Sequence, residues 1–360
     1  MISVLLPDFR GGGAERVQLD LAYEFARAGY DVEFVLMRKT GEFLKEAEAN
    51  FPVIHLRAPR VRNVPIPLLR YLRVRQPDAL LVAMWPLTAI VPVVARAAGF
   101  RRRVAISEHA VLGRQYRCWG KLHYIALRAS TFFGYRLSDA LIGVSNGVCD
   151  EMSALSLMRR HRFVTIYNPL RTISPPSPKS FRRAERLWGG GGARILSVGT
   201  FKPVKNHALL LHAFSRLSNP ESVLMLVGQG ELEQQLRVLA VELGIAERVI
   251  FAGFHADLAP FYATADLFVL SSDHEGFGNV IVEALSFGLP VVSTDCPSGP
   301  AEILDGGRFG RLIPVGDAEA LSRAMEEALS APVDRQMLRA RAADFSPEKV
   351  ARQYLEVLGL

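Results

Sequence analysis

The sequence predicts an α/β protein of two domains, each built on a parallel β-sheet. Three observations support this fold class. Short apolar runs alternate with helical patterns along most of the chain, which is typical of βαβ units. The length of 360 residues is more than a single hydrophobic core usually serves. A segment rich in Pro, Ser and Gly at residues 168–192 interrupts the alternation, which then starts again.

The first domain is expected to begin with a strand, a helix and a second strand. An apolar run at residues 2–6 is followed by a helical pattern at 14–28, which Gly29 closes, and by a second apolar run at 32–37. The remaining strands of this domain are expected at residues 53–56, 79–84, 104–107, 140–144 and 163–166.

The uncharged segment at residues 79–95 approaches the minimum length of a membrane-spanning helix. Pro86 and Pro92 disfavour a continuous helix. Strands that are buried on both faces of a parallel sheet also read as continuous apolar runs. We therefore expect a strand, a turn and a helix that begins near Pro86, with a membrane span as the alternative.

The second domain repeats the alternation and ends in a helix. Ser346 is a suitable N-cap for this terminal helix, and Pro347 suits its first position. The strands of the second domain are expected at residues 195–198, 223–227, 249–251, 267–270 and 291–293. We therefore expect an N-terminal domain, a linker, a C-terminal domain and a terminal helix at residues 1–168, 169–192, 193–344 and 345–360.

Cysteine usage and charge restrict the compartment and the partners. Cys118, Cys149 and Cys296 are far apart and lack the spacing of a metal site, which favours a reducing, cytoplasmic location and disfavours disulfides and thiol catalysis. The net charge is +10 over residues 1–167 and −3 over the rest. The first half therefore favours an acidic partner: nucleic acid, an anionic lipid surface or a phosphate-bearing substrate.

Three loops that follow expected strands are candidate binding sites, because ligands of open parallel sheets lie at the carboxyl ends of strands. A glycine run, Gly11 to Gly13, precedes a helix and suits an anion, although a purely structural turn is the alternative. The loop at residues 199–206 contains Lys202 and Lys205, which would hold a diphosphate unless they are merely solvated.

The third loop, HEGFGNVIVEA at residues 274–284, contains two glutamates around a predicted helix start. Glu275 lies at the turn between strand and helix, and Glu283 lies just past the first helical turn, so the two could contact different parts of one ligand. The alternative is that both acids are simply exposed.

Five motifs in this order resemble the retaining glycosyltransferases of family 4, which have the GT-B fold. The motifs are GGGAE near the N-terminus, GTFKPVKN, FAGFHADL, EGFGNVIVEA and GLPVVSTD. The resemblance implies two Rossmann-like domains facing a cleft, with the acceptor on the first, the nucleotide sugar on the second, and the terminal helix crossing back to the first.

The resemblance also implies roles for individual residues. Glu283 would bind the ribose, Phe254 and His255 would meet the base, and His109 would lie beside the transferred sugar with Glu275. The remaining donor contacts would come from residues that bind the phosphates or the sugar: Gly12, Gly13, Thr200, Lys202, Lys205, Gly276, Phe277, Gly278 and Asn279. Many family members have Arg at the position of Thr200; Lys202 would substitute, although Lys lacks the bidentate fork of Arg.

The reaction is expected to need no metal cofactor. The chain contains no Asp-x-Asp, the usual carboxylate pair that holds a metal-bound sugar diphosphate. Lys205, Lys202 and helix N-termini would stabilise the leaving diphosphate instead. We expect retention of configuration, with the leaving phosphate oxygen helping to deprotonate the acceptor; a covalent glutamate route stays open. The loop at residues 296–302 resembles members that use UDP-N-acetylhexosamines, which favours a UDP-sugar donor.

A basic helix is predicted at residues 115–135. At about 100° per residue, four cations share one face beside an apolar strip of Trp119, Leu122, Ala126 and Phe133. These cations are Arg114, Arg117, Lys121 and Arg128. We interpret the surface as one that grips a glycan or lipid-linked acceptor on an anionic membrane, which places the protein peripherally on the cytoplasmic face of the inner membrane. A core helix with a solvated basic side is the alternative.

Two other functions compete with glycosyl transfer. A nucleotide-sugar epimerase of the same fold would need no acceptor and would leave the basic helix unexplained. A nucleic-acid-binding protein would account for the basic half, but no recognisable binding module is present, so we expect no nucleic-acid partner.

Overall fold

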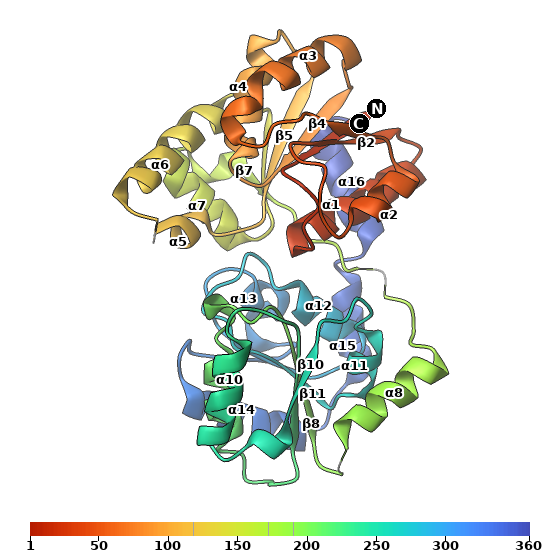
Figure 1. Cartoon of the computed structure of the whole chain (residues 1–360), viewed down its shortest axis with the longest axis vertical. Helices are drawn as coiled ribbons and strands as arrows, with labels where there is room; N and C mark the ends of the chain where they lie inside the picture. Colours follow the sequence, from red (N-terminus) through yellow and green to blue (C-terminus); the bar gives the residue numbers. More distant parts are fainter. Residues whose placement is uncertain (118, 172, 190) are drawn as a thin grey trace. The chain divides into compact units, whose positions relative to one another are not determined.

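The computed structural model describes residues 1–117, 119–171, 173–189 and 191–360, without the side chain of Arg117. The chain forms two compact units (Figure 1). Unit 1 contains Met1–Arg171 and Phe345–Leu360, and unit 2 contains Thr172–Asp344. Each unit holds one parallel sheet, which confirms the predicted fold class. The interpretation of Cys118 lies outside the described residues.

Unit 1 contains a seven-stranded sheet of order β3-β2-β1-β4-β5-β6-β7. Apolar side chains fill nearly every position of its central strands, because helices cover both faces. The strands are β1 Ile2–Leu6, β2 Val32–Leu36, β3 Val53–His55, β4 Ala79–Ala83, β5 Arg103–Glu108, β6 Ala140–Gly143 and β7 Phe163–Thr165. The helices are α1 Gly13–Arg27, α2 Leu44–Asn50, η1 Val61–Asn63, α3 Pro65–Arg75, α4 Leu87–Ala97, α5 Leu112–Arg117, α6 Lys121–Arg136, α7 Asn146–Ser156, η2 Arg160–Arg162 and α16 Pro347–Leu358.

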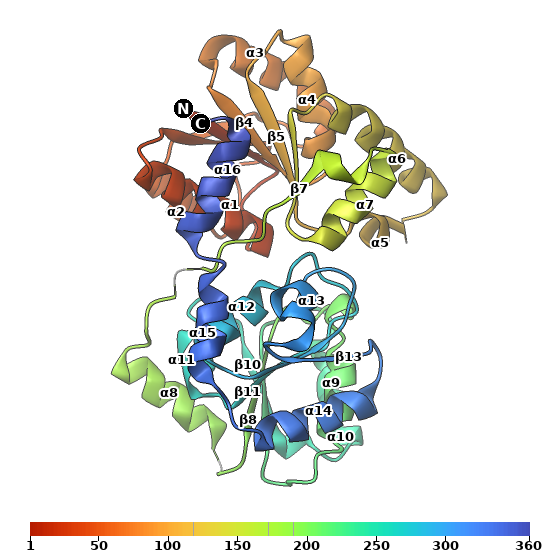
Figure 2. The ribbon, with the colours of Figure 1, turned by 180° about the vertical axis from the view of Figure 1, so that it is seen from behind.

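The helices of unit 1 form two layers. The strand order runs outward from β1 to β3 in one direction and from β4 to β7 in the other. Right-handed crossovers therefore place α1 and α2 on one face, and α3, α4, α6 and α7 on the opposite face. The terminal helix α16 packs against α1, β4 and β5 (Figure 2). Within the second layer, α3 packs on α4, α4 on α6, and α6 on α7.

The single helix predicted at residues 115–135 is wrong. The structure has two helices, because α5 ends at Arg117 and α6 begins at Lys121. Gly120, the N-cap of α6, has φ 97°, a conformation that continuous helix does not contain and that glycine adopts readily. Arg114 and Lys121 therefore lie on different helices, and the predicted common face does not extend over both.

The apolar segment at residues 79–95 is a strand followed by a helix, as predicted. Buried β4 leads into α4 after Pro86, and Pro92 lies inside α4. Within the described residues, no helix is long and apolar enough to cross a membrane.

Unit 2 contains a six-stranded parallel sheet of order β10-β9-β8-β11-β12-β13. The strands are β8 Arg194–Val198, β9 Val223–Val227, β10 Val249–Gly253, β11 Leu267–Leu270, β12 Val291–Thr294 and β13 Arg311–Ile313. The helices are α8 Pro178–Trp188, η3 Pro203–Lys205, α9 His207–Phe214, α10 Glu233–Glu242, η4 Ala246–Arg248, α11 Ala259–Thr264, α12 Asn279–Ser286, α13 Pro300–Ile303, η5 Asp305–Gly307, α14 Ala318–Ser330 and α15 Arg335–Ala343.

Two elements of unit 2 differ from the sequence-based expectation. The short edge strand β13 was not predicted, because its three residues include an arginine and show no alternating pattern. The expected linker contains helix α8, which Ser177 caps at its N-terminus. Trp188 at the end of α8 is fully buried and donates a hydrogen bond from Nε1 to Oγ1 of Thr264 at 2.8 Å. This helix is therefore part of unit 2 and not a free connection.

Candidate functional site

The loops after β8 and β11 bring Lys205 and Glu275 into contact in unit 2. Nζ of Lys205 lies 2.6 Å from Oε1 of Glu275, and Ser272 donates a second hydrogen bond to the same oxygen at 2.6 Å. The Glu275 side chain is 10% exposed and that of Lys205 is 23% exposed. Because the ion pair is mostly enclosed and Ser272 also donates to it, the Glu275 carboxylate is held in one orientation. This pair lies where the carboxyl ends of parallel strands place ligands.

Backbone geometry fixes the loop that carries Lys205. Asn206 has a left-handed φ of 44°, and its side chain accepts a hydrogen bond from the amide of Leu209, so it caps α9 directly after Lys205. Nδ2 of Asn206 also donates to Asp273 at 2.8 Å, and Oγ of Ser271 donates to the carbonyl of Lys205 at 2.9 Å. The two loops are thus tied together on either side of the ion pair.

Glu283 lies on α12, one turn past the helix start, and is 8% exposed. The hydroxyl of Tyr262, a fully buried residue of α11, donates to Oε2 of Glu283 at 2.9 Å. Tyr262 itself stacks on Phe287 with ring centroids 5.6 Å apart. Tyr262 therefore helps to orient Glu283, whose carboxylate is a group that can accept several hydrogen bonds, for example from a diol.

The backbone at the start of α12 is not covered by a capping side chain, so a ligand could approach it closely. Its N-cap, Gly278, has φ 101° and supplies no side-chain cap. Phe277 is buried, and a Cβ on Gly299 would overlap the Phe277 carbonyl, so the loop before α13 packs directly on this turn. Oγ of Ser298 donates to the carbonyl of Glu275 at 2.7 Å. The turn from Gly276 to Asn279 is therefore held in place directly after Glu275 by its contacts with the loop before α13.

The other residues predicted to bind the donor lie at the same ends of the strands. Thr200 and Lys202 are exposed on the loop after β8. Phe254 directly follows β10 and is 57% exposed, which leaves its ring available for stacking. His255 is held by a hydrogen bond between its Nε2 and the carbonyl of Ala252 at 3.0 Å.

Several residues that shape this site were not found from the sequence. Tyr262 and Ser272 are single polar positions whose role depends on contacts across the sheet. Gly228 directly follows β9, and a Cβ there would overlap the carbonyl oxygen of Gly199. Gly228 could have been found from the sequence, because the stretch VGQG comes at the end of an expected strand, as the three candidate binding loops do.

In unit 1, His109 lies at the carboxyl end of β5 in a polar network. Gln18 Nε2 and Ser107 Oγ each lie 3.1 Å from Nε2 of His109, and Ser107 Oγ lies 3.0 Å from the hydroxyl of Tyr354 on α16. Nε2 of His109 is therefore within hydrogen-bonding distance of both side chains, whereas its Nδ1 is buried.

His109 is neutral at physiological pH. Burial lowers the pKa of its imidazole to about 4, and contact with Asn168 opposes this shift. A neutral imidazole carries one N–H donor and one acceptor nitrogen, so it can form hydrogen bonds with hydroxyl groups, but it does not supply a positive charge to a diphosphate.

The glycine loop of unit 1 is surrounded by carboxyl groups. Gly12 is the N-cap of α1, and the space that its side chain would fill faces the carboxyl group of Glu15. Burial raises the pKa of Glu15 to about 7. Glu42 similarly faces Gly11. Gly12 and Gly13 thus lie at the start of α1, as predicted. An anion could bind there only if the Glu15 carboxyl group moved away or were protonated.

The basic residues predicted to bind the acceptor are dispersed over two helices. Arg114 is exposed on α5, whereas Lys121 is exposed and Arg128 partly exposed on α6. The side chain of Arg117 lies outside the described residues. The apolar strip beside them faces solvent: Trp119 is 58% and Leu122 81% exposed. Helix α6 buries Leu127 and Tyr135 on its other side, so an acceptor role for its basic residues stays a prediction.

Cysteine chemistry does not contribute to this site. Cys149 and Cys296 are buried and not disulfide-bonded. Burial raises the pKa of the Cys296 thiol to about 12, so it stays protonated. No group of three or more His, Cys, Asp or Glu side chains in the described part of the chain is arranged to hold a metal ion.

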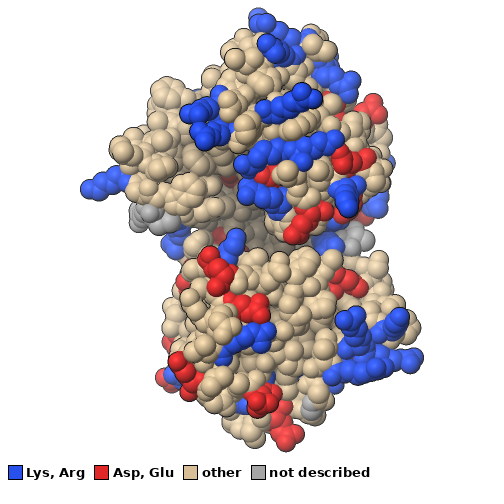
Figure 3. Space-filling view, in the orientation of Figure 1, with Lys and Arg blue, Asp and Glu red and all other residues tan. Residues whose placement is uncertain are grey.

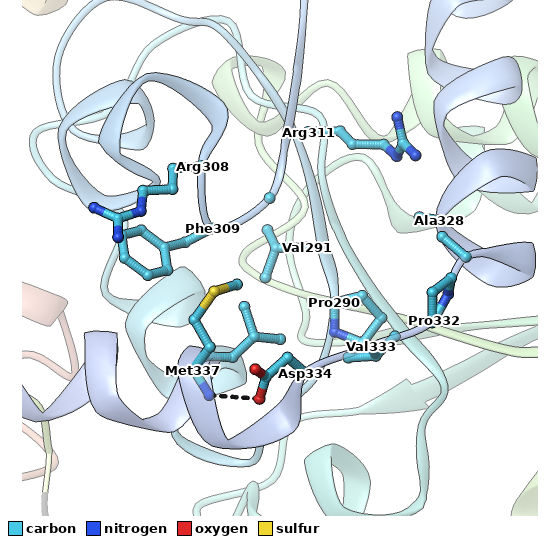
Figure 4. A pocket seen from close by; sticks show the side chains of 13 residues that line it. Pro290, Val291, Arg308, Phe309, Arg311, Ala328, Pro332, Val333, Asp334 and Met337 are labelled. Atoms are coloured by element: carbon cyan, nitrogen blue, oxygen red, sulfur yellow. Dashed lines mark hydrogen bonds between the residues drawn. The ribbon is translucent and has the colours of Figure 1, made fainter.

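A pocket of about 140 Å³ lies elsewhere in unit 2 (Figure 4). It is lined by Val291 and Arg311 at the starts of β12 and β13, by Phe309, and by Met337 on α15. The amide of Met337 donates to Oδ1 of Asp334 at 2.9 Å, which caps α15. Because this pocket adjoins the amino ends of the strands, it is distinct from the Lys205–Glu275 site.

Two family models match the chain. The model described as Glycosyltransferase Family 4 matches residues 11–172, and the model described as Glycosyl transferases group 1 matches residues 179–345. The lipopolysaccharide core biosynthesis glycosyltransferase LpsE of Rhizobium meliloti (strain 1021) is 33% identical over 62% of this chain and 65% of its own length. The N-acetylgalactosamine-N,N'-diacetylbacillosaminyl-diphospho-undecaprenol 4-alpha-N-acetylgalactosaminyltransferase of Campylobacter jejuni is 34% identical over 46% of each protein. The chain thus spans about half to two thirds of the length of these curated relatives.

Solved structures share the fold along the whole chain. HepE of Anabaena in complex with UDP-glucose has a TM-score of 0.85 at 21% identity and covers 99% of both chains. The lipopolysaccharide outer core galactosyltransferase WaaB in its apo form has a TM-score of 0.73 at 18% identity, with the same coverage. The two family models, which together span residues 11–345, and the shared two-sheet fold show that this chain belongs to glycosyltransferase family 4 and has the GT-B fold.

Proposed function

We propose that this chain is a hexosyltransferase that uses a nucleotide sugar, with a UDP-sugar favoured, and transfers a hexose or N-acetylhexosamine to a glycan or lipid-linked acceptor in bacterial surface polysaccharide assembly. The single observation that carries this proposal is the enclosed pair of Lys205 and Glu275 at the ends of the unit 2 strands, with Glu283 one turn past the start of the following helix α12. The relatives named for lipopolysaccharide biosynthesis and the HepE complex with UDP-glucose support the acceptor and donor classes.

Each part of the donor meets a different group in this proposal. Glu283, oriented by Tyr262, binds the ribose hydroxyls, and Phe254 with His255 meets the base. Lys205 and Lys202 bind the diphosphate, with Thr200 and the start of α12 beside them. Glu275 accepts hydrogen bonds from hydroxyls of the transferred sugar while Lys205 keeps its charge paired. In unit 1, the imidazole of His109 forms a hydrogen bond with the sugar, and Gly12 and Gly13 approach the phosphates.

The proposed reaction retains the anomeric configuration and needs no metal ion. The bond between the anomeric carbon and the diphosphate oxygen breaks, and the acceptor hydroxyl attacks from the same face. Its proton passes to the leaving phosphate oxygen. Lys205 and Lys202 stabilise the negative charge that develops on the diphosphate, which is the largest electrostatic demand of the step. The ion pair with Lys205 makes Glu275 a weak nucleophile, which disfavours the covalent route.

Hydrolysis of the donor in the absence of acceptor tests this reaction without knowledge of the acceptor. Purified protein would be incubated with UDP-glucose, UDP-galactose and their N-acetylhexosamine counterparts. The proposal predicts slow release of UDP together with an equal amount of free sugar, which proton NMR detects first as the anomer present in the donor. An epimerase would interconvert nucleotide sugars without stoichiometric UDP release. Release of the opposite anomer would refute retention.

We also propose that the enzyme works peripherally on the cytoplasmic face of the inner membrane, where Arg114, Lys121 and Arg128 of unit 1 contact an anionic or pyrophosphate-bearing acceptor. The positive charge of the first half supports this placement. Replacement of Lys121 by Glu should weaken use of the acceptor and leave the affinity for UDP unchanged. An equal loss of both would refute an acceptor role for Lys121.

A further inference from the structure

The terminal helix α16 buries one polar side chain in unit 1. The buried residues of this helix are Val350, Ala351, Tyr354 and Leu358, and Tyr354 is fully buried. Burial raises the pKa of the Tyr354 hydroxyl to about 12, so this group is a neutral phenol at physiological pH. A buried hydroxyl needs a hydrogen-bond partner, and Oγ of Ser107 lies 3.0 Å from the hydroxyl of Tyr354.

The alternation of side chains along β5 explains why Tyr354 meets Ser107. Successive side chains of a strand point to opposite faces, so Ser107 and His109 share one face and Glu108 lies on the other. Glu108 accepts a hydrogen bond from Tyr135 of α6, which belongs to the layer of α3, α4, α6 and α7. Ser107 and His109 therefore face the layer of α1 and α16, and α16 packs on β5 (Figure 2).

Two helices of this layer hold His109. Its Nε2 lies 3.1 Å from Oγ of Ser107 and 3.1 Å from the side-chain amide of Gln18 on α1. Gln18, Ser107 and Tyr354 are fully buried, whereas His109 is partly exposed. The imidazole is thus fixed from inside unit 1 by groups that a ligand does not reach.

Neutral groups, not ions, surround the imidazole. Figure 3 shows Lys and Arg gathered on the surface of unit 1. Among the described residues, the side chains in polar contact with the ring of His109 are the neutral Gln18, Ser107 and Asn168. A neutral imidazole takes its orientation and the position of its ring proton from such hydrogen bonds. A change in the hydrogen bonding of Ser107 should therefore act directly on the ring.

We propose that Tyr354 is a positioning residue for His109, and that it acts through Ser107 to hold the imidazole in one orientation and one tautomer. This inference rests on the proposed function, because His109 is the group of unit 1 that contacts the transferred sugar there. It adds a role for the terminal helix in forming the site. Only residues 344–346 separate α16 from α15 of unit 2, so the segment that leaves unit 2 carries a member of this network.

The first test is nitrogen NMR of the imidazole rings in the full chain, prepared with isotope-labelled histidine and measured without ligand. The signals of His109 are those that disappear in His109→Gln. We expect one ring nitrogen at the shift of a protonated nitrogen and the other at that of an unprotonated one. Tyr354→Phe removes only the hydroxyl, and it should move both signals towards the average of two exchanging tautomers.

Tyr71→Phe is the matched control. Tyr71 is a buried tyrosine of α3, in the opposite layer, and its hydroxyl lies 2.7 Å from Oγ of Ser3. Loss of this hydroxyl should leave the His109 signals unchanged, whereas a general loosening of unit 1 would move them in both variants. Ser107→Ala should also shift the His109 signals. Addition of Tyr354→Phe to Ser107→Ala should shift them no further, because Tyr354 acts through Ser107.

The second test is hydrolysis of the donor in the absence of acceptor. Tyr354→Phe should lower kcat about tenfold and leave KM for the nucleotide sugar within about twofold, because a misplaced ring disturbs the reacting geometry more than the binding of the nucleotide. Tyr71→Phe should leave both constants at their wild-type values.

The outcomes separate this inference from the proposed function. Unchanged His109 signals in Tyr354→Phe, or equal changes in Tyr354→Phe and Tyr71→Phe, would overturn the inference. Altered His109 signals with an unaltered kcat would support the positioning and refute the use of His109 in the reaction. Failure of the wild type to release UDP from any donor would refute the proposed function, and the NMR comparison would still decide whether Tyr354 positions His109.

Discussion

Removal of the Glu283 carboxylate should weaken UDP binding through the ribose. Glu283 is 8% exposed and its Oε2 already accepts from Tyr262 at 2.9 Å, so the carboxylate is held in place before the ligand arrives. Hydrogen bonds to a charged group contribute about 1.5–3 kcal/mol each. Loss of the contacts with a ribose diol should therefore cost about 3 kcal/mol, or an affinity about 150-fold lower in Glu283→Ala.

The effect should depend on the ribose hydroxyl. Calorimetric titration of wild type and Glu283→Ala with UDP and with 2'-deoxy-UDP forms a double-mutant cycle. Deoxygenation should lower the affinity of the wild type about tenfold and leave that of Glu283→Ala nearly unchanged. Tyr262→Phe, which keeps the carboxylate and removes only its orienting donor, should lose about fivefold. Additive losses from the protein and ligand changes would show that Glu283 does not touch the ribose.

Three further predictions follow from individual contacts. Lys205→Ala should lower the affinity for UDP about 30-fold and leave that for uridine unchanged, as calorimetry would show, because the only part of the ligand that the lysine contacts in this proposal is the diphosphate. Burial raises the pKa of Glu108 to about 7, so its stabilising contribution is full below about pH 4.5 and is lost as the pH rises towards 7. The free energy of unfolding of the wild type, measured with denaturant, should therefore fall by about 2.5 kcal/mol between pH 5 and pH 8, and that of Glu108→Gln should not show this fall. Gly228→Ala, which forces a Cβ onto the Gly199 carbonyl, should lower the free energy of unfolding by about 2 kcal/mol or more, whereas the uncrowded Gly244→Ala should cost less.

The sequence was sufficient to predict the layout of unit 2 because parallel sheets obey a simple rule. Loops after β8 and β11 emerge at the same edge of the sheet, so residues in GTFKPVKN and HEGFGNVIVEA were expected to approach one ligand. The structure places Lys205 and Glu275 in direct contact. Their roles in binding and catalysis stay predictions. Tyr262 could not be found in this way, because its contact with Glu283 depends on how α11 packs beside α12.

The differences between the predicted and observed helices have local causes. Helical periodicity continues across Gly120, so the pattern alone did not reveal that a left-handed glycine separates α5 from α6. The pattern also could not show that the apolar strip of α6 faces outward, since Leu127 and Tyr135 supply a second apolar face that packs inward. In the linker, abundant Pro and Ser concealed α8, although Ser177 and Pro178 form a regular helix start.

The central claim is that unit 2 binds a uridine diphosphate sugar without a metal ion. Calorimetric titration of the purified chain with UDP, GDP and ADP, in the presence of a chelator, tests it most directly. We predict that UDP binds, that GDP and ADP bind more weakly, and that Glu283→Ala loses the affinity for UDP. Binding that the chelator abolishes would contradict metal independence, and failure of all three nucleotides to bind would contradict the donor site itself.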